Sequence, residues 1–453
     1  MFQTIRNAWK IPDVRKKVFY TLFIIFIFRL GSAVPVPFLD AAVLRASVKA
    51  ASDALANGGG NILNYFNTLT GGAFENATLF AMGVTPYINS SIIIQLLTVA
   101  IPPLEKLAKE GEEGRKKLAQ ITRYTTVILG LIQGTAYFFY LKYNHVSMPD
   151  GSSKVATIWN NGGFNEWFAA FVIVLTFTAG TALMMWLGEQ INQRGIGNGI
   201  SMLLFAGIVS RGPDGFKSLY TMVEAGLQGG ANTKYIFFAI AIPIIFLAII
   251  GFIVFMDNAE RRIPVQYAKR MVGRKMYGGQ STHIPIKVNM SGVMPIIFAS
   301  SIITIPQTVR QFVYPNGGKG FWYSFWNAFR YDGWLYPTLF FVLIILFAYF
   351  YVTIQYNPIE MANNLRKNSG VIPGIRPGRP TTEFISKIIR RITLIGALFL
   401  SVIALLPIAF GSITKTALGI GGTSILILVG VALETVRQLE SQMLMRHYKG
   451  FLD

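Results

Sequence analysis

The residue types that most often carry chemistry are scarce in this chain, and their spacing does not suit catalysis. There is no cysteine, and the three histidines, His145, His283 and His447, lie far apart in the 453 residues. No metal-ligand spacing, nucleophilic triad or Walker loop occurs. The glycine-rich run Gly195–Gly199 follows an apolar helix instead of a buried strand, which favours a tight turn over a phosphate-binding loop. We therefore expect no catalytic site, no metal and no cofactor.

Ionisable residues inside the apolar stretches are also few. Arg29 lies within the first stretch, whereas Glu189 and Glu434 lie near the ends that we place in the cytoplasm. A proton- or sodium-coupled transporter usually keeps a carboxylate near the middle of the membrane. The sequence offers no such carboxylate, which counts against a secondary small-solute transporter, the main alternative function. An intramembrane enzyme is the other alternative, and it lacks a catalytic dyad or metal ligands.

Aliphatic side chains at helical spacing stand out in four apolar stretches that Gly, Pro or polar residues interrupt. Two of these stretches carry aliphatic pairs four residues apart, which places each pair on one helix face. One interpretation is ordinary helix packing or contact with lipid. The other is a hydrophobic constriction that resists ions by dewetting, in place of the polar filter of an ion channel. The candidate constriction consists of Ile88, Ile92, Ile200, Leu204, Ile297 and Ile427.

The elements that must position these residues are ten apolar stretches, in a chain that is 52% hydrophobic and only 14% charged. A helix needs ~20 apolar residues to cross ~30 Å of hydrocarbon. The uninterrupted stretches are Val18–Val36, Leu118–Tyr143, Trp167–Leu187, Tyr235–Phe255, Gly333–Ile354 and Ile392–Phe410. The interrupted ones are Ala77–Ile101, Gly199–Val209, Ser291–Phe312 and Gly421–Val436. The predicted fold class is an all-α polytopic membrane protein with ten transmembrane helices.

The ten spans divide into two halves of five, and because five is odd the second half crosses the membrane inverted relative to the first. The halves are residues 18–209 and 235–436, with an external hinge loop at 210–234 between them. The interrupted spans are the second and fifth of each half. Because broken helices in inverted repeats line a path between the halves, we expect these four spans to surround a central hourglass pore.

Positive charge indicates how the chain is oriented. Lys and Arg concentrate in every second gap between the spans, and the formal net charge is +20. The positive-inside rule therefore places the amphipathic N-terminal segment (1–17) and the C-terminal tail (437–453) in the cytoplasm. Two cytoplasmic loops, at 257–287 and 356–391, carry more positive charge than orientation requires. They suit anionic lipid or an anionic partner such as RNA or an acidic protein surface.

A short amphipathic segment precedes the second span on the external side. Alone it predicts an interfacial helix, and beside a constriction it is suited to be a plug. The segment consists of Asn61, Ile62, Leu63, Asn64, Tyr65, Phe66, Asn67, Thr68 and Leu69.

Several long motifs, in order along the chain, resemble those of the SecY family, the central channel subunit of the bacterial protein translocase. They are FAMGVTPYINSSIIIQLL (Phe80–Leu97), WLGEQINQRGIGNGIS (Trp186–Ser201), GGQSTHIPIKVNMSGVMP (Gly278–Pro295), NPIEMANNLRK (Asn357–Lys367), PGIRPG (Pro373–Gly378) and GGTSILILVGVALE (Gly421–Glu434). The resemblance covers nearly the whole chain. One departure is the stretch Ala41–Gly60, which is longer than in many bacterial relatives. Because of it, the resemblance does not fix the residue at which the plug begins.

The resemblance implies a clamshell hinged between spans five and six, with a lateral gate formed by spans two, three, seven and eight. It implies that the six aliphatic residues are the pore ring and that 61–69 is the plug. It also implies docking of the SecA ATPase and the ribosome on the basic loops, at Arg274, Lys275 and Arg376. Small SecE-like and SecG-like membrane subunits would complete the complex.

By the same resemblance the chain conducts unfolded secretory polypeptides across the bacterial plasma membrane and releases apolar helices sideways into lipid. It is a passive channel subunit and not an enzyme. The hydrolysis of ATP or GTP that drives transport is supplied by the partners.

Overall fold

The structure is a computed structural model that describes residues 6, 9–46, 67, 70–143, 146–147, 153–158, 163–228, 233–267, 270–272, 275–277, 281–313, 320–329, 333–414 and 422–449. Most of the predicted plug, and the docking residue Arg274, lie outside these ranges.

The first half of the chain is built from long helices with short connections. They are α2 (Pro12–Gly31), α5 (Thr85–Ala100), α6 (Pro102–Lys109), α7 (Glu112–Tyr143), α8 (Phe164–Arg194) and α9 (Gly199–Ser210). Pro86 lies in the first turn of α5, where its missing N–H costs no helical hydrogen bond. Asn198 caps α9 by accepting hydrogen bonds from two backbone N–H groups. Local sequence signals therefore account for where these two helices begin.

The second half is also built mainly from helices. Its helices are α11 (Thr233–Asn258), α12 (Met294–Val313), α13 (Phe321–Asn327), α14 (Leu335–Gln355), α15 (Pro358–Lys367), α16 (Arg379–Thr414) and α17 (Gly422–Lys449). Pro243 and Pro306 lie inside α11 and α12. Asn357 caps α15, and Pro358 follows at the first helical position.

Each predicted span coincides with one helix, in chain order α2, α5, α7, α8, α9, α11, α12, α14, α16 and α17. By length and hydropathy alone, 5 segments of the described chain are long and apolar enough to cross a membrane. The pair α5 and α6, bent by 102°, would make a sixth. The interrupted spans α9, α12 and α17 are not among the five, and neither is α2.

The segment 210–234 is largely helical where a loop was predicted. It contains α10 (Gly212–Gln228), which packs against α11. The Gly-Pro-Asp-Gly start resembles a turn, but Pro213 stands in the first helical turn, where proline is tolerated. The helix then carries Phe216, Tyr220 and Leu227, all strongly exposed. Exposed apolar side chains of this kind suit a lipid environment.

The basic loops contain strands that the hydropathy pattern did not predict. Strands β3 (Glu260–Tyr267) and β6 (Ser281–Lys287) pair antiparallel from Glu260 with Lys287 to Gln266 with Ser281. Strand β7 (Gly370–Val371) adds to the other edge of β3. Within the hairpin, β4 (Arg270–Val272) pairs with β5 (Lys275–Tyr277). A further short pair is β1 (Val146–Ser147) with β2 (Ser153–Lys154). Ile263, Val265 and Ile286 anchor the hairpin in an apolar cluster with residues of α15 and α16.

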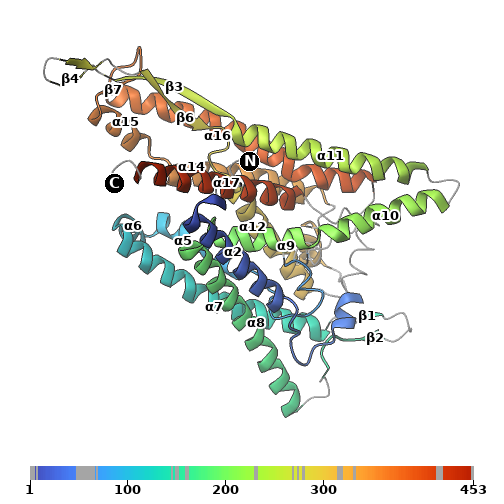
Figure 1. Cartoon of the computed structure of the whole chain (residues 1–453). Helices are drawn as coiled ribbons and strands as arrows, with labels where there is room; N and C mark the ends of the chain where they lie inside the picture. Colours follow the sequence, from blue (N-terminus) through green and yellow to red (C-terminus); the bar gives the residue numbers. More distant parts are fainter. Residues whose placement is uncertain are drawn as a thin grey trace.

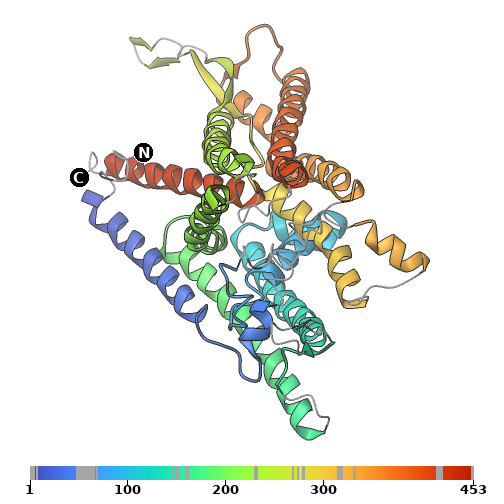
Figure 2. The ribbon, with the colours of Figure 1, turned by 90° about the vertical axis from the view of Figure 1, so that its right-hand side faces the viewer.

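Figure 1 shows the two halves as two layers, with α2, α5, α7 and α8 below and α11, α14, α16 and α17 above. The β3–β6 hairpin, α6, α15 and the end of α17 lie at one end of the molecule, and β1–β2 and the far end of α10 lie at the other. This separation agrees with the two faces that the charge pattern predicts. Figure 2 shows the same helices after a quarter turn.

Candidate functional site

An apolar cluster joins the two halves at the centre of the molecule. It includes Ile200 and Leu204 of α9, Ile297 of α12 and Ile427 of α17, all at most 9% exposed. Ile88 of α5 is partly buried and packs against the same cluster. Five of the six predicted ring residues are therefore brought together, and they come from the four interrupted helices.

The sixth residue, Ile92 of α5, belongs to the adjoining cluster of the second half, where it lies with Ile296 and Ile303 of α12. Ile88 packs against both clusters. The face of α5 that carries the pair Ile88–Ile92 therefore extends from the central cluster onto α12. Because α7 also contacts α12, these three helices form the seam where the halves meet on this side.

The central cluster has a simple chemical capacity. Its side chains are aliphatic and offer no hydrogen bond to a passing chain, so they cannot select a sequence by polar contacts. A tightly packed apolar constriction excludes hydrated ions because their shells cannot be replaced there. Aliphatic side chains that change rotamer can surround a polypeptide of any sequence. The site therefore suits a seal around a chemically varied chain.

The predicted plug is described only at Asn67, and its other eight residues lie outside the described ranges. Asn67 is 2% exposed, and both ends of its side-chain amide bind Glu75. Its Nδ2 donates to Glu75 Oε2 at 2.6 Å, and its Oδ1 accepts from Glu75 N at 3.2 Å. Its backbone carbonyl accepts from Gly72 N at 2.9 Å. The predicted plug segment is therefore fastened, at Asn67, to the loop that follows it.

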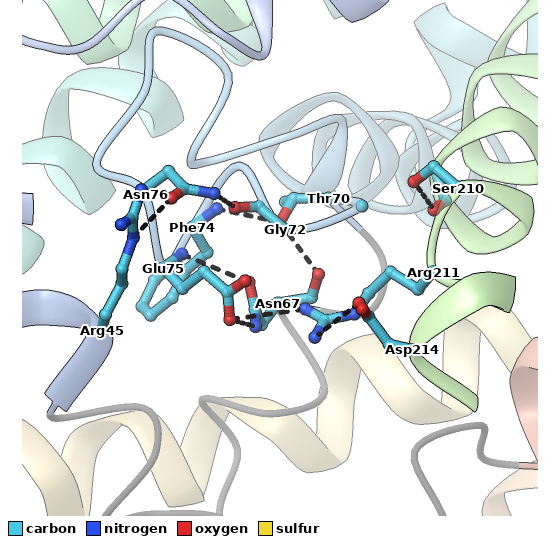
Figure 3. Close-up of polar contacts among 12 residues, drawn as sticks. Arg45, Asn67, Thr70, Gly72, Phe74, Glu75, Asn76, Ser210, Arg211 and Asp214 are labelled. Carbon is cyan, nitrogen blue, oxygen red and sulfur yellow. Dashed lines mark hydrogen bonds and ion pairs between the residues drawn. The ribbon is translucent and has the colours of Figure 1, made fainter. Parts of the chain in front are cut away.

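That loop, residues 70–78, is in turn bound by the side chains of Arg211 and Arg45 (Figure 3). Glu75 Oε2 lies 3.6 Å from Nη1 of Arg211, the residue that ends α9, and Arg211 also pairs with Asp214 of α10 at 3.5 Å. Asn76 Oδ1 accepts from Arg45 Nε at 2.8 Å. The Glu75 and Arg211 side chains are 28% and 20% exposed, so their ion pair is partly shielded from water.

Gly71 lies directly against the backbone of α9. Its φ of +64° is a left-handed conformation, and an added Cβ would lie 2.8 Å from the Gly207 carbonyl oxygen. Arg29 Nη1 donates to the Gly71 carbonyl at 3.3 Å and to Ser210 Oγ at 3.1 Å. Arg29, in the last turn of α2, thus bridges α2, the loop and α9. Only glycine permits this close contact without strain.

Glu75 and Arg211 were not predicted as site residues, and Arg29 stood out in the sequence only as a charge within an apolar stretch. The sequence gives only a weak indication that Glu75 belongs to the site: it is an isolated acid close to the pair Gly71–Gly72, just before the second span. Its partner is far away in the sequence, so spacing does not reveal the pair.

The two basic loops lie at the end of the molecule that we place in the cytoplasm. Arg376 is exposed, Lys275 belongs to β5 at the far end of the hairpin, and Arg274 lies outside the described residues. At the root of the hairpin, burial and, to a smaller extent, the charge of Arg437 lower the pKa of Lys287. Among the described residues, no group of three or more His, Asp or Glu side chains could hold a metal ion.

Comparisons with known proteins agree with this geometry. The family model described as SecY matches residues 78–436. The chain is 43% identical to the protein translocase subunit SecY of Streptomyces galbus and 42% identical to that of Halalkalibacterium halodurans, in each case over 100% of both chains.

Solved structures show the same fold at lower sequence identity. A protein-conducting channel gives a TM-score of 0.63 at 19% identity, with 97% of each chain covered. A channel studied for the way its plug domain maintains a membrane seal gives 0.62 at 19%, again covering 97% of each chain. Sec61 in a canine ribosome–channel complex gives 0.58 at 18% over the same share of each chain.

Proposed function

This chain belongs to the SecY family of protein-translocation channels, and from that premise we propose that unfolded polypeptides cross the membrane through the central apolar cluster. The observation that carries the proposal is the meeting of Ile88, Ile200, Leu204, Ile297 and Ile427 in one cluster. Four interrupted helices from both inverted halves supply them. In this proposal they are the pore ring, with Ile92 at its edge toward α12.

The ring acts as a deformable seal. At rest it is packed shut by its own side chains, and during transport it closes around the backbone of the passing chain. The plug segment supports the resting seal from the external side, held by the contacts of Asn67. No step of this proposed transport needs a catalytic group on this chain. This agrees with the family, which is one of channels and not of enzymes.

Lateral release follows from the seam between α5, α7 and α12. When the halves separate there, an apolar segment in the pore meets lipid and leaves sideways. Each Leu, Ile, Phe or Val at the centre of such a segment gains about 0.3–0.6 kcal/mol by insertion. A segment of ~20 such residues therefore partitions strongly, whereas a polar chain continues across the membrane.

The driving force comes from partners in this proposal. SecA, by hydrolysing ATP, or the elongating ribosome pushes the chain, and both dock on the cytoplasmic basic loops at Arg274, Lys275 and Arg376. SecE-like and SecG-like subunits complete the complex in the bacterial plasma membrane, where anionic lipid contacts the basic surface. The ribosome-bound Sec61 neighbour supports ribosome docking on this fold.

The absence of cysteine from the chain makes a direct test possible. Ile88→Cys or Ile297→Cys is combined with a stalled secretory precursor that carries one cysteine, and membranes are oxidised with the partners present. A disulfide that depends on the signal sequence supports the ring. The matched control is Leu247→Cys, on the 67% exposed face of α11.

Crosslinks at Leu247→Cys in place of the ring positions would contradict the pore assignment while leaving translocation intact. If no precursor engages, the small-solute transporter becomes the better hypothesis. No contact in the described structure favours that alternative.

A further inference from the structure

Apart from the central apolar cluster, the main contacts between the two halves lie at three places within the described residues. α10 packs against α11, the next helix along the chain, and α5 and α7 pack against α12. The third meeting place is at the cytoplasmic end, where α17 of the second half contacts α9 and α2 of the first. Figure 2 shows the beginning of α2 close to the end of α17. Part of the α9–α17 contact belongs to the ring, but neither the ring nor the predicted plug accounts for the contacts that residues 438–443 make with the first half.

The glycine-rich turn between α8 and α9 forms a socket for α17. Gly197 N donates to Gln438 Oε1 at 2.9 Å. Gly197 has a φ of +88°, and an added Cβ would lie 3.3 Å from Thr435 Oγ1. The neighbouring Ile196 N donates to Thr21 Oγ1 of α2 at 3.0 Å, which holds the turn in place. The run Gly195–Gly199, for which the sequence favours a tight turn over a phosphate-binding loop, thus has a structural partner in α17.

Apolar packing reinforces the socket. Leu439 of α17 is 8% exposed and is buried with Ile196 and with Val14 of α2. One turn further along α17, Gln442 Oε1 accepts from Lys17 Nζ at 3.3 Å. Gln438 and Gln442 are four residues apart, so both lie on the helix face that the first half covers.

The adjacent face of α17 is bound to its own half. Arg437 Nη2 lies 2.9 Å from Asp257 Oδ2 and also donates to the Asp257 carbonyl oxygen and to Asn258 Oδ1. Asn289, which follows β6, donates to Asp257 Oδ1 at 3.2 Å. The Asp257 side chain is 12% exposed, so this pair is well shielded. α17 is therefore bound firmly to the second half at the level where it reaches the first.

We propose that residues 437–443 of α17, seated in the Gly195–Gly199 turn and on the start of α2, form a cytoplasmic pivot about which the two halves turn when the seam at α12 opens. A rotation axis needs two points. The packing of α10 against α11 supplies one, toward the opposite end of the molecule, and this contact supplies the other. With the first point alone, the halves would also separate at the cytoplasmic face.

The composition of the contact suits a pivot. It consists of two hydrogen bonds that glutamine side-chain carbonyls accept and of a small buried cluster. Such contacts allow a change of angle without breaking a rigid charge pair. The charge pair with Asp257 lies on the side that moves with α17. Ile427 lies on the same helix, eleven residues before Gln438 and ~16 Å away at 1.5 Å per residue. The ring residue is therefore held by the helix that forms the pivot.

This inference rests on the proposed function for its meaning, but its test does not require transport. Gln193 of α8 and Glu360 of α15 are exposed, one on each half. Both are changed to cysteine in the otherwise cysteine-free chain, spin-labelled, and reconstituted with the co-purifying subunits in lipid nanodiscs. Double electron–electron resonance then gives the distribution of distances between the halves at the cytoplasmic face.

The pivot variant combines Gln438→Ala with Leu439→Ala, and the control is Ser441→Ala, an exposed position on the same turn. We expect the control to keep the parent distribution and the pivot variant to give a broader one with a longer mean distance. An unchanged distribution in the folded pivot variant overturns the proposal. If that variant does not fold, Gln442→Ala and Gly197→Ala replace it, with the same two outcomes.

The two proposals fail in different ways. If the parent protein translocates precursors and the pivot variant shows an unchanged distance distribution, the pivot is overturned and the channel function stays in place. If the parent protein conducts no precursor but the pivot variant broadens the distribution, the contact stands and the channel function falls.

Discussion

At the scale of single residues, the described structure places its charges beside the apolar ring and not within it. Arg29, Glu75 and Arg211 hold the loop that follows the plug, and the ring itself is aliphatic. Burying an unpaired charge is costly, so a charge near the membrane interior persists only with partners. In the proposed function, these charges therefore bear on the resting seal and not on contact with the transported chain.

The ion pair between Glu75 and Arg211 gives a first prediction. Arg211→Gln leaves the partly buried Glu75 carboxylate without its cation, so we expect the free energy of unfolding to fall by about 1–3 kcal/mol. Ion leakage of resting channels in proteoliposomes should rise at the same time. The control is Arg379→Gln, whose pair with Glu383 is 90% and 66% exposed and should change stability by less than about 0.5 kcal/mol. Equal effects of the two substitutions would contradict the assignment.

Gly71 gives a second prediction. Gly71→Ala adds a methyl group at a left-handed φ and 2.8 Å from a backbone oxygen of α9. We expect a loss of stability of about 1–3 kcal/mol and a leakier resting channel. The control is Gly251→Ala inside α11, where nothing lies within 4 Å, and where alanine should be neutral or stabilise by up to about 1 kcal/mol. Thermal unfolding in detergent compares the two, and a neutral Gly71→Ala would show that the loop does not need this close contact.

At the scale of elements, the β3–β6 hairpin converts a basic loop into a defined projection. Along β3, Ile263 and Val265 are buried, whereas Arg262, Pro264 and Gln266 on the opposite face are exposed. Alternation of this kind fixes which side chains a sheet presents to solvent. The positive charge is thus displayed on a rigid support next to the end of α15.

The proposed docking role predicts a response to charge reversal on this surface. Arg376→Glu should weaken the binding of ribosomes or SecA to reconstituted channels by at least ~10-fold at low salt, with a smaller effect at high salt because charges are screened. Lys154→Glu, the same change on exposed β2 at the other end of the molecule, is the control. Co-sedimentation measures both, and equal weakening would indicate a general charge effect and no docking surface.

At the scale of the whole molecule, orientation remains a prediction from the charge pattern. Lys154→Cys and Lys367→Cys place single, exposed thiols at the two ends of the molecule. In intact spheroplasts, a membrane-impermeant maleimide should label Lys154→Cys directly. It should label Lys367→Cys only after the membrane is opened, because positive loops stay in the cytoplasm. The reverse pattern would invert the orientation and place the basic loops outside.

Much of the fold could be predicted from the sequence because a membrane imposes local rules. Apolar length predicts the spans, and each of the ten coincides with a helix. The strands of the basic loop could not be predicted in this way, because hydropathy windows do not detect short amphipathic hairpins. α10 was missed because its Gly-Pro-Asp-Gly start has the composition of a turn.

The sequence by itself determined the class of protein, the inverted halves, the expected orientation and, through its motifs, the family. These depend on hydrophobic length, charge and local patterns, which are read along one segment at a time. Only the tertiary structure decided which aliphatic residues share a cluster, that Glu75 faces Arg211, and that α17 is seated in the Gly195–Gly199 turn. The physical reason is that each of these contacts joins segments far apart in the chain, and neither partner's local sequence specifies the other.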